Sequence, residues 1–541
     1  MQGKLLNKGP LDASSILLYY FHNSIVHPQE MKYTYLIIAL FLSFKSYSQA
    51  LDQTLLSQLT DKNWQHGISL LQEIVSIPND AFYPEQAELN IKWSEEQFKK
   101  RDWSTQRLET GGIPLLLVEK SSLGATKTIL FYFHMDGQAV DRSLWDQEDP
   151  YTPELKEQDA QGNWVTISKD RLKSEYNPDW RIFARSASDD KGPLAMFLTG
   201  MDALEDEGIS PDFNIKVILD FEEEKGSPKL PEAVKKYKSL LASDMMLIMD
   251  GPRHTSNEPT LSYGARGIAD LTLTTYGPRV PQHSGHYGNY APNPALLLSQ
   301  LLASMKDANG RVIIPGYYDG INLTQTEKEI LSKVPDDENS IQQKLGIGRT
   351  DQVGKTYQES IQYPSLNIRG LESAWVGSEA RTIVPATAIA EIDVRLVPES
   401  DPERLFGLIK NHIEDQGFHI VAQDPTDEER MKYPKIVKVD FIISYQAFRT
   451  PMDSDAGKWL RASMNRAFGK EPVQIRISGG SIPISPFVDA LGIPAVTIPT
   501  VNADNNQHSP NENIRLGNYK DGIITVMSIL TQTTQNALEF K

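Results

Sequence analysis

Short apolar runs alternate with helical stretches in the first half of the chain. The apolar runs lie at residues 113–118, 128–133, 215–221 and 245–249. The stretch at 192–205 has the apolar spacing of a helix, and another helical pattern starts near Asp52. Because buried strands separated by helices are typical of βαβ units, this half predicts an α/β fold with a mostly parallel sheet flanked by helices.

The order of elements changes from residue 262. Strand patterns lie at 267–275, 365–375, 387–397 and 437–445, and helical patterns lie at 294–305 and 402–416. The resulting order, β-α-β-β-α-β, is that of a ferredoxin-like α+β domain. The α/β pattern resumes with a helix at 455–468 and a strand at 495–498. We therefore expect a catalytic domain of residues 49–261 and 448–541, interrupted by an inserted domain of residues 262–447.

One apolar stretch near the start does not belong to this alternation. Residues 35–44 form an apolar run of ten, about half of the ~20 residues that a membrane-spanning helix needs. The run follows Met31 and Lys32 and precedes Ser46 and Ser48, which is the pattern of a secretory signal peptide at 31–48. Residues 1–30 would then be an over-called start, and the alternative is a buried N-terminal helix. The prediction is a secreted or periplasmic protein without a stable membrane anchor.

Composition narrows the possible ligands and partners. The 541 residues include 54 Lys and Arg against 71 Asp and Glu, a formal net charge of −17, with no basic cluster. Nucleic acid and anionic membrane are therefore not expected partners. The chain has no cysteine, which excludes disulfides, thiolate metal sites and cysteine nucleophiles and suits a bacterial envelope protein stabilised by its core. Any metal ion must be held by His, Asp and Glu.

Polar residues stand where the predicted strands end. His134 and Asp136 follow the run at 128–133, and the period of two places both on one side of the strand. Asp189 and Asp190 precede a helix. Each pair also has an ordinary explanation, because carboxylates before a helix are common caps and a His-x-Asp sequence after a strand arises often by chance.

Three further positions complete the pattern. Glu222, Glu223 and Glu224 follow one apolar run, Asp250 follows the next, and His508 lies in a polar loop near the C-terminus. Separately, these residues fit a solvated acidic face, a turn and a surface histidine. Together with the preceding pairs they place two histidines and at least three carboxylates near the carboxyl ends of strands, where ligands bind in α/β sheets. This ligand set suits a dinuclear zinc site with an open position for water.

The motifs occur in an order that resembles a known family. They are His-Met-Asp at 134–136, Ser-Asp-Asp-Lys-Gly at 188–192, Glu-Glu-Lys-Gly-Ser at 223–227, Asp250 and His508. The chain resembles the zinc aminopeptidase-like hydrolases, which include carnosinase-like dipeptidases, glutamate carboxypeptidase, acetylornithine deacetylase and succinyl-diaminopimelate desuccinylase. The resemblance implies a zinc-aminopeptidase-like catalytic domain with an inserted ferredoxin-like domain that serves as lid and dimerisation domain.

The resemblance also implies how two divalent metal ions are held. His134 and Asp250 would bind one ion, Glu224 and His508 would bind the other, and Asp189 would bridge the two. Zinc is the expected metal, with manganese and cobalt as alternatives.

Further motifs indicate the carnosinase-like branch of the family. They are Tyr-Gly-Ala-Arg-Gly at 263–267, His-Ser-Gly at 283–285, Tyr-Pro-Ser-Leu at 363–366, Thr-Ile-Val-Pro at 382–385, Arg-Leu-Val-Pro at 395–398 and Gly-Gly-Ser-Ile-Pro at 479–483. The chain departs from the pattern at Gly137, where an apolar residue is more usual, and at Arg381. We expect both departures to affect substrate fit more than metal binding.

Catalytic and substrate-binding roles follow from the same resemblance. Asp136 would orient His134, Glu223 would be the general base, and His283 would reach into the active site of a homodimer partner. One zinc ion and His283 are the candidates for stabilising the oxyanion. The expected substrate-binding residues are Arg395, Thr382, Gly480 and Ser481. Arg395 would hold the α-carboxylate in a bidentate pair. Alternatively, His283 is a capped loop residue and Arg395 a surface cation of its strand.

These parts predict a secreted metallopeptidase that hydrolyses dipeptides or short peptides with a free C-terminal carboxylate. A hydroxide bridging two metal ions would attack the amide, and Glu223 would move the proton to the leaving amine. One alternative is an N-acyl-amino-acid deacylase or carboxypeptidase on the same scaffold. Another is a non-catalytic metal- or peptide-binding protein, although a purely structural site has no need of an unligated base.

Overall fold

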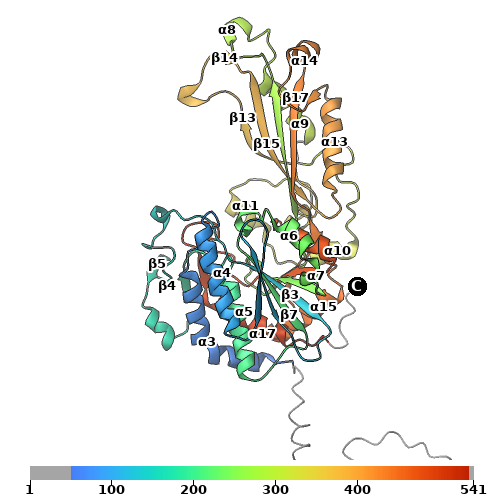
Figure 1. Cartoon of the computed structure of the whole chain (residues 1–541). Coiled ribbons are helices and arrows are strands. Elements are labelled where there is room, and N and C mark those ends of the chain that lie inside the picture. The colour runs from blue at the N-terminus through green and yellow to red at the C-terminus, as the bar shows by residue number, and fades with distance from the viewer. Residues whose placement is uncertain (1–49, 535–541) are drawn as a thin grey trace, which may run out of the picture. The chain divides into compact units, whose positions relative to one another are not determined.

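The computed structural model describes residues 50–534 (Figure 1). The predicted over-called start at 1–30 and the predicted signal peptide at 31–48 lie outside these described residues. Within the described range, no helix combines the length and the apolar character needed to cross a membrane.

An eight-stranded sheet forms the larger part of the fold, with the strand order β1-β2-β7-β3-β8-β20-β9-β19. Its strands are β1 (Ser104–Leu108), β2 (Leu115–Lys120), β3 (Thr128–His134), β7 (Asn214–Asp220), β8 (Met245–Ile248), β9 (Thr260–Ser262), β19 (Val473–Ile475) and β20 (Ala495–Thr497). The neighbours β7, β3, β8 and β20 run parallel. Their carboxyl ends therefore meet at one edge of the sheet.

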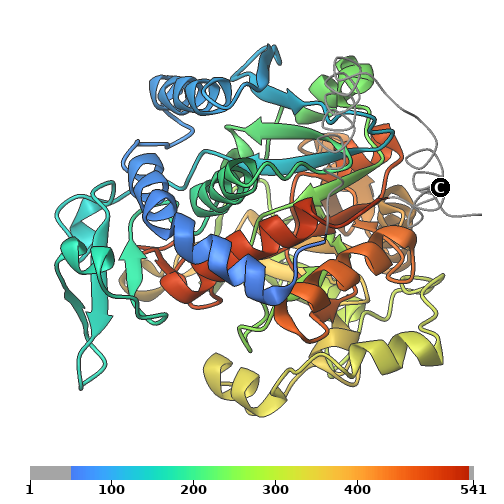
Figure 2. The same cartoon turned by 90° about the horizontal axis from the view of Figure 1, so that it is seen from below.

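Helices cover both faces of this sheet, which is why its central strands are apolar on both sides. On one face lie α3 (Gln53–Val75), α4 (Pro84–Lys99), α5 (Lys191–Asp206), α15 (Asp455–Phe468) and α17 (Leu516–Leu530). On the other face lie α6 (Leu230–Lys236), α7 (Lys238–Leu241) and α16 (Ser485–Leu491). Helices α3, α5 and α17 contact one another on the first of these faces, and Figure 2 shows them together.

Glycines allow α5 and α17 to approach closely. Gly200 of α5 faces Val526 of α17, and a Cβ added at Gly200 would lie 2.7 Å from Val526 Cγ1 and 3.2 Å from its Cβ. Val526 is fully buried and β-branched, so it has little freedom to move aside.

A smaller sheet brings the C-terminal part of the chain beside residues 181–183. Its order is β21-β6-β4-β5, with β4 (Glu154–Gln158), β5 (Trp164–Thr166), β6 (Arg181–Phe183) and β21 (Asn513–Arg515). Two short 3₁₀ helices, η1 (Arg142–Leu144) and η2 (Lys169–Lys173), flank its strands. Because β21 pairs with β6, the loop that carries His508 lies against the loop that carries Asp189.

A separate five-stranded sheet is built from residues between the two halves of the large sheet. Its order is β13-β15-β11-β17-β16, with β11 (Gly267–Tyr276), β13 (Asn367–Glu372), β15 (Thr387–Leu396), β16 (His419–Val421) and β17 (Ile436–Tyr445). Helices α9 (Pro294–Met305) and α13 (Pro402–Asp415) pack on it around a core of its own. Figure 1 shows this sheet in its upper part.

Short elements connect and extend this second sheet. At its upper end in Figure 1, β12 (Gln282–His283) pairs with β14 (Ile383–Val384) beside α8 (Ser284–Tyr287), and α14 (Asp427–Lys432) lies nearby. The long segment after α9 carries α10 (Gln325–Leu331), α11 (Glu338–Leu345) and α12 (Tyr357–Ser360). At the junction with the large sheet, β10 (Gly264–Ala265) pairs with β18 (Phe448–Arg449).

The predicted α/β class is confirmed, and the strands and helices that the sequence predicts begin and end close to the expected residues, whereas the smaller sheet of β4, β5, β6 and β21 was not predicted. The antiparallel pairs formed by β1 and β2, β2 and β7, and β20 and β9 make the large sheet mixed rather than uniformly parallel. In the second sheet, β13, β15, β11 and β17 pair antiparallel in a ferredoxin-like order, while β16 is an addition that the sequence pattern did not indicate. The domain boundaries at 49–261, 262–447 and 448–541 stay predictions.

The close contact between α5 and α17 predicts how much a methyl group added at Gly200 destabilises the folded protein. Gly200→Ala is expected to lower the free energy of unfolding by about 1–3 kcal/mol, because the new Cβ overlaps Val526. Gly407→Ala in α13 is the control, since no atom lies within 4 Å of a Cβ at that position. The control is expected to stabilise the protein by up to about 1 kcal/mol. Urea unfolding measures both, and equal effects would contradict the packing explanation.

Candidate metal centre and active site

The carboxyl ends of three parallel strands bring the candidate residues together. His134 is the last residue of β3, and Asp250 follows β8. Glu223 and Glu224 lie in the 3₁₀ turn η3 (Glu223–Lys225) directly after β7. Residues that are far apart in the sequence therefore meet at one edge of the sheet, as the strand-end pattern predicts.

Asp189 is shared by two groups of potential ligands. The first group is His134, Asp189 and Asp250, and the second is Asp189, Glu224 and His508. In each group, one ligand atom from every residue lies within 4.8 Å of the others. Asp189 Oδ1 lies 2.8 Å from His134 Nε2, and Asp189 Oδ2 lies 3.0 Å from His508 Nε2. One carboxylate thus faces both groups with a different oxygen.

The two groups fit divalent metal ions. His Nε2 and carboxylate oxygens are ligands that zinc accepts, and the site contains no cysteine. Among residues 50–534, the ion-pair partners of Asp189, Glu224 and Asp250 are the two histidines rather than lysine or arginine. Such a concentration of carboxylates without basic side chains is suited to neutralisation by bound cations.

Burial and crowding of like charges shift the pKa values of these groups. Burial, together with the charge of Asp189, raises the pKa of Glu224 to about 7 and that of Asp250 to about 6. Burial opposes ionisation of Asp189 as well, but hydrogen bonds with His134 and His508 outweigh it and lower its pKa. The hydrogen bond with Asp189 raises the pKa of His508 to about 9. The protein alone therefore does not stabilise all of these carboxylates as anions.

Asp136 connects the ligand histidine to the expected base. Its Oδ1 lies 3.5 Å from His134 Nδ1. Its two oxygens accept the backbone N–H groups of Glu223, at 3.1 Å, and Glu224, at 2.9 Å. This geometry suits the predicted orienting role of Asp136, which stays a prediction.

Glu223 lies inside the same cluster without a hydrogen bond to its carboxylate from another described residue. Burial raises its pKa well above the usual range, and the nearby charges of Asp250 and Glu224 raise it further, against the effect of His134. A carboxyl group with a raised pKa beside a metal site is suited to accept and return a proton.

Glu512 is a residue that sequence reasoning missed. Its side chain is buried and accepts the backbone N–H groups of Ser186 at 2.8 Å, Ser188 at 3.0 Å and Asp189 at 3.0 Å. Arg185 Nη1 donates to the same carboxylate at 2.8 Å. Glu512 therefore holds the loop that presents Asp189. Its position four residues after His508 is the one local signal that would have drawn attention to it.

The structure explains the unusual glycine after His-x-Asp. A Cβ on Gly137 would overlap Ser186 Oγ and lie 3.1 Å from Asn79 Nδ2. Asn79 Nδ2 donates to Ser186 Oγ at 2.9 Å, and the Gly137 N–H donates to the Asn79 carbonyl at 2.9 Å. Gly137 thus permits close packing of three loops, whereas we expected this departure to affect substrate fit.

Two of the expected substrate-binding residues lie in contact. Arg395, near the end of β15, donates from Nη1 to Ser481 Oγ at 2.8 Å, and Asp393 Oδ2 lies 3.4 Å from its Nε. Its side chain is 31% exposed, so it remains accessible to a ligand. Gly480, beside Ser481, has open space where a Cβ would stand.

His283 and Thr382 form a second group at the upper end of the five-stranded sheet in Figure 1. His283 pairs with Ile383, and the Ser284 N–H donates to the Thr382 carbonyl at 3.0 Å. His283 is exposed, and its Nδ1 accepts the N–H of Gly285 at 3.0 Å. This contact is the capping interaction of the alternative interpretation, and it leaves Nε2 free to donate. The structure does not bring this group into contact with the metal-ligand cluster of the same chain.

Curated dipeptidases are similar over most of their length. The chain is 27% identical over 494 residues to the Cys-Gly metallodipeptidase dug1 of Schizosaccharomyces pombe, covering 86% of this chain and 95% of that protein. It is 28% identical over 418 residues to the Beta-Ala-His dipeptidase of Homo sapiens, covering 76% of this chain and 75% of that protein.

The comparisons contradict the predicted secreted or periplasmic location. The similar Cys-Gly metallodipeptidases of Schizosaccharomyces pombe, Saccharomyces cerevisiae and Candida albicans are cytosolic enzymes. The prediction of a secreted or periplasmic location is therefore wrong. Its physical weakness is that an apolar run of this length also fits a buried core helix, so the run alone does not determine export.

Solved structures and a family profile identify the fold and the family. A metallo-carboxypeptidase of the M20 family from Sulfolobus solfataricus superposes with a TM-score of 0.69 at 27% identity, covering 86% of this chain and 98% of that one. Human carnosine dipeptidase 1 shares the fold with a TM-score of 0.67 at 24% identity, covering 89% and 98%. The profile of Peptidase family M20/M25/M40 matches residues 130–532. The chain therefore belongs to Peptidase family M20/M25/M40, which confirms the predicted dinuclear metallopeptidase family and its hydrolytic class.

Proposed function

We propose that this protein is a metal-dependent peptidase that hydrolyses dipeptides or short peptides with a free C-terminal carboxylate. The observation that carries the proposal is the shared carboxylate of Asp189 between two ligand groups, with the unligated Glu223 beside them. The names of the similar dipeptidases support this substrate class.

The ligand groups are proposed to hold two divalent ions. His134 and Asp250 would hold one, Glu224 and His508 would hold the other, and Asp189 would serve both. Zinc suits the nitrogen and oxygen donors, and manganese or cobalt are alternatives. When bound, the ions supply Lewis acidity that polarises the scissile carbonyl and lowers the pKa of water.

Protein side chains perform the proton transfer and the positioning. Glu223 takes a proton from the attacking water and returns it to the leaving amine. Asp136 keeps Glu223 and Glu224 in place through their backbone N–H groups. Arg395 binds the α-carboxylate of the substrate while Ser481 orients its guanidinium.

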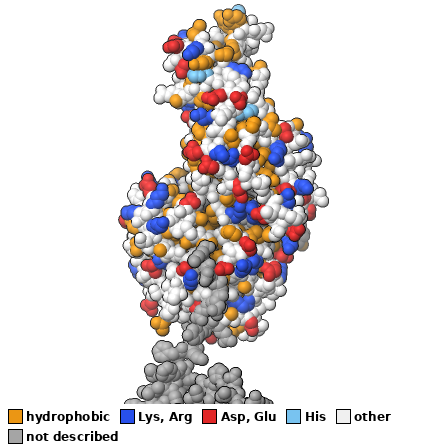
Figure 3. Space-filling view, turned by 90° about the vertical axis from the view of Figure 1, so that its right-hand side faces the viewer, with side chains coloured by type: hydrophobic (Ala, Val, Ile, Leu, Met, Phe, Trp, Pro, Cys, Tyr) orange, Lys and Arg blue, Asp and Glu red, His pale blue; other side chains and the backbone are white. Residues whose placement is uncertain are grey.

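A homodimer through the five-stranded sheet completes the proposed site. β13 is an edge strand with exposed Ile368 and Leu371, and the loop after it exposes Trp375 and Val376. Figure 3 shows the opposite side of the structure, that of α13, where hydrophobic side chains at the upper end stand among charged ones. An unpaired edge strand with apolar side chains is suited to bind another chain.

His283 then acts on the partner's substrate, with Thr382 beside it. Because the Nδ1 of His283 accepts a backbone N–H, its Nε2 carries the proton in the neutral ring and donates to the oxyanion. This assignment explains why a residue of the expected active site lies in the two-stranded sheet of β12 and β14.

A carboxypeptidase activity is the second candidate, favoured by the similarity to the carboxypeptidase from Sulfolobus solfataricus. The same scaffold also suits N-acyl-amino-acid deacylation. A substrate panel of dipeptides, longer peptides and N-acetyl amino acids separates these activities. Faster turnover of N-acetyl amino acids than of any peptide would favour the deacylase. A non-catalytic binding protein would hydrolyse none of them.

Metal removal is expected to abolish activity and to lower stability. Without cations the buried carboxylates repel one another, so metal binding stabilises the folded state by about 2.7 kcal/mol when free metal is 100-fold above its Kd. The test is dipeptide hydrolysis and thermal unfolding after chelation, then after addition of zinc, manganese or cobalt. Full activity in protein shown by elemental analysis to be metal-free would contradict the proposal.

Glu223→Gln is expected to lower kcat by ~10²–10⁴-fold, because the amide accepts no proton from water. Bound metal, measured by elemental analysis, should stay unchanged, since Glu223 is not proposed as a ligand. The control is Glu222→Gln, whose carboxylate instead pairs with Lys225 at 2.9 Å. The control should change kcat by less than ~10-fold. Similar losses in both variants would refute the assignment of the base.

Mixing two inactive variants tests whether His283 acts on the partner. His283→Ala and Glu223→Gln homodimers are each expected to be nearly inactive. After exchange of subunits, activity should recover to about a quarter of the wild-type value, because half of the dimers are mixed and each mixed dimer has one intact site. His286→Ala, whose ring lies 4.8 Å from that of His283, is the control and should stay active. Mixed dimers without recovered activity would exclude action on the partner.

A further inference from the structure

Arg266 is a buried cation that has no counter-ion among the described residues. Its side chain belongs to a residue that is 8% exposed, and the one hydrogen bond to it among residues 50–534 runs from Nη2 to the Tyr363 carbonyl at 2.8 Å. Its Nε has no hydrogen-bond partner in the described part of the chain. Burial, and then the nearby charge of Arg395, lower its pKa to about 10. A buried charge that lacks a partner is costly unless a ligand supplies one.

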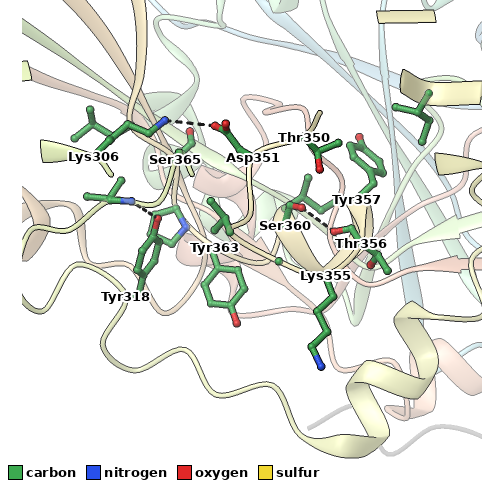
Figure 4. Close-up of a pocket in the computed structure, with 18 of the residues that line it drawn as sticks. Lys306, Tyr318, Thr350, Asp351, Lys355, Thr356, Tyr357, Ser360, Tyr363 and Ser365 are labelled. Carbon is green, nitrogen blue, oxygen red and sulfur yellow. Dashed lines mark hydrogen bonds and ion pairs between the residues drawn. The ribbon is translucent and has the colours of Figure 1, made fainter. Parts of the chain in front are cut away.

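Arg266 lines a cavity of about 310 Å³ beneath the segment that follows α9. Figure 4 shows Tyr318, Tyr357 and Tyr363 among the side chains that surround it. The lining combines these aromatic rings with Arg266, which is the composition of a pocket for a small group that ends in a polar function.

The other charged residues of the lining have partners or extend outward. Lys306 Nζ lies 3.8 Å from Asp351 Oδ2, as the dashed line in Figure 4 shows. Glu338 Oε1 accepts the Tyr357 N–H at 2.6 Å. Lys355 is exposed and points away from the other labelled side chains in Figure 4. Arg266 is therefore the buried charge of this cavity that is left for a ligand.

The cavity shares walls with the proposed site for the substrate α-carboxylate. Ser365, which lines the cavity, donates its N–H to the Arg395 carbonyl at 3.0 Å and accepts the Arg395 N–H on its Oγ at 3.2 Å. Tyr357 Oη lies 3.4 Å from the position of a Cβ on Gly479, which directly precedes Gly480 and Ser481. A C-terminal residue held by Arg395 would therefore have this cavity beside it.

We propose that the cavity receives the side chain of the substrate's C-terminal residue and that Arg266 pairs with a carboxylate on it, which makes peptides ending in Glu or Asp the preferred substrates. The inference rests on the proposed peptidase function. Such a residue has two carboxylates, and each of the two arginines binds one of them. Arg395 binds the α-carboxylate beside Ser481, and Arg266 binds the side-chain carboxylate with the planar fork that suits this group.

A neutral side chain of the same size would leave Arg266 unpaired. A site built for a polar partner discriminates strongly against analogues that lack it, because its own buried group then stays unsatisfied. The expected preference is therefore at least ~10-fold in kcat/KM for Ala-Glu over Ala-Gln, two peptides that differ in charge and hardly in shape.

The experiment compares these two peptides in the metal-loaded enzyme and in matched variants. Arg266→Met should reduce the Ala-Glu to Ala-Gln ratio to about 1 while kcat/KM for Ala-Gln stays within ~3-fold, because it removes a charge that Ala-Gln does not use. Arg266→Lys keeps a cation but loses the fork, so its ratio should lie between those of wild type and Arg266→Met. Lys355→Met, which removes an exposed cation of the same lining, should leave the ratio unchanged.

Each other outcome overturns the inference in a recognisable way. The inference is wrong if the Ala-Glu to Ala-Gln ratio is near 1 in wild type, or if it is the same in wild type and Arg266→Met. Either result would show that Arg266 does not bind the side-chain carboxylate of the substrate. Equal losses on both peptides in folded Arg266→Met would place Arg266 on the α-carboxylate. If Arg266→Met does not fold, Arg266→Lys serves in its place. A ratio of Ala-Glu to Ala-Gln hydrolysis that is the same in Arg266→Lys and in wild type would then contradict the inference. If the enzyme hydrolyses neither peptide, that result contradicts the proposed function itself, and this inference with it.

Discussion

The site depends on one carboxylate that is shared by two groups of ligands. Asp189 faces His134 with one oxygen and His508 with the other, and these histidines come from opposite ends of the chain. Glu512 holds the Asp189 loop through three backbone N–H groups, and β21 holds the His508 loop against β6. Because no lysine or arginine of the described residues pairs with Asp189, Glu224 or Asp250, the ligand cluster depends on bound cations for its charge balance.

The same charge argument links the metal centre to the substrate site. At the sheet edge, Asp189, Glu224 and Asp250 gather without a lysine or arginine partner among the described residues, whereas Arg395 and Arg266 place positive charge where a substrate carboxylate is expected. Asp393 partly balances Arg395, but Arg266 has no acidic partner in the described part of the chain. A peptide that spans the two regions would present its carbonyl to the acidic, metal-binding side and its carboxylates to the arginines.

Local patterns predicted the main strands and the residues that the structure gathers at the sheet edge, for a specific reason. Runs such as 128–133 are buried strands, and polar residues directly after a parallel strand meet at the sheet edge whatever the order of the strands. The extra strand β16 was missed because its three residues carry too short a pattern. Glu512 and the cavity at Arg266 were missed because their partners lie far away in the sequence. The envelope location was wrong because a short apolar run has more than one physical explanation.

By itself, the sequence determined the class of fold, the order of the elements and the set of residues able to bind metal, since hydrophobic periodicity and residue chemistry are local properties. Tertiary structure alone decided which oxygen of Asp189 meets which histidine, why Gly137 must lack a side chain, and that Arg266 is buried without an acidic partner among the described residues. Such features arise where loops from distant parts of the chain pack together. Their geometry follows from how the strands pair and how the side chains pack. A short stretch of sequence carries information on neither.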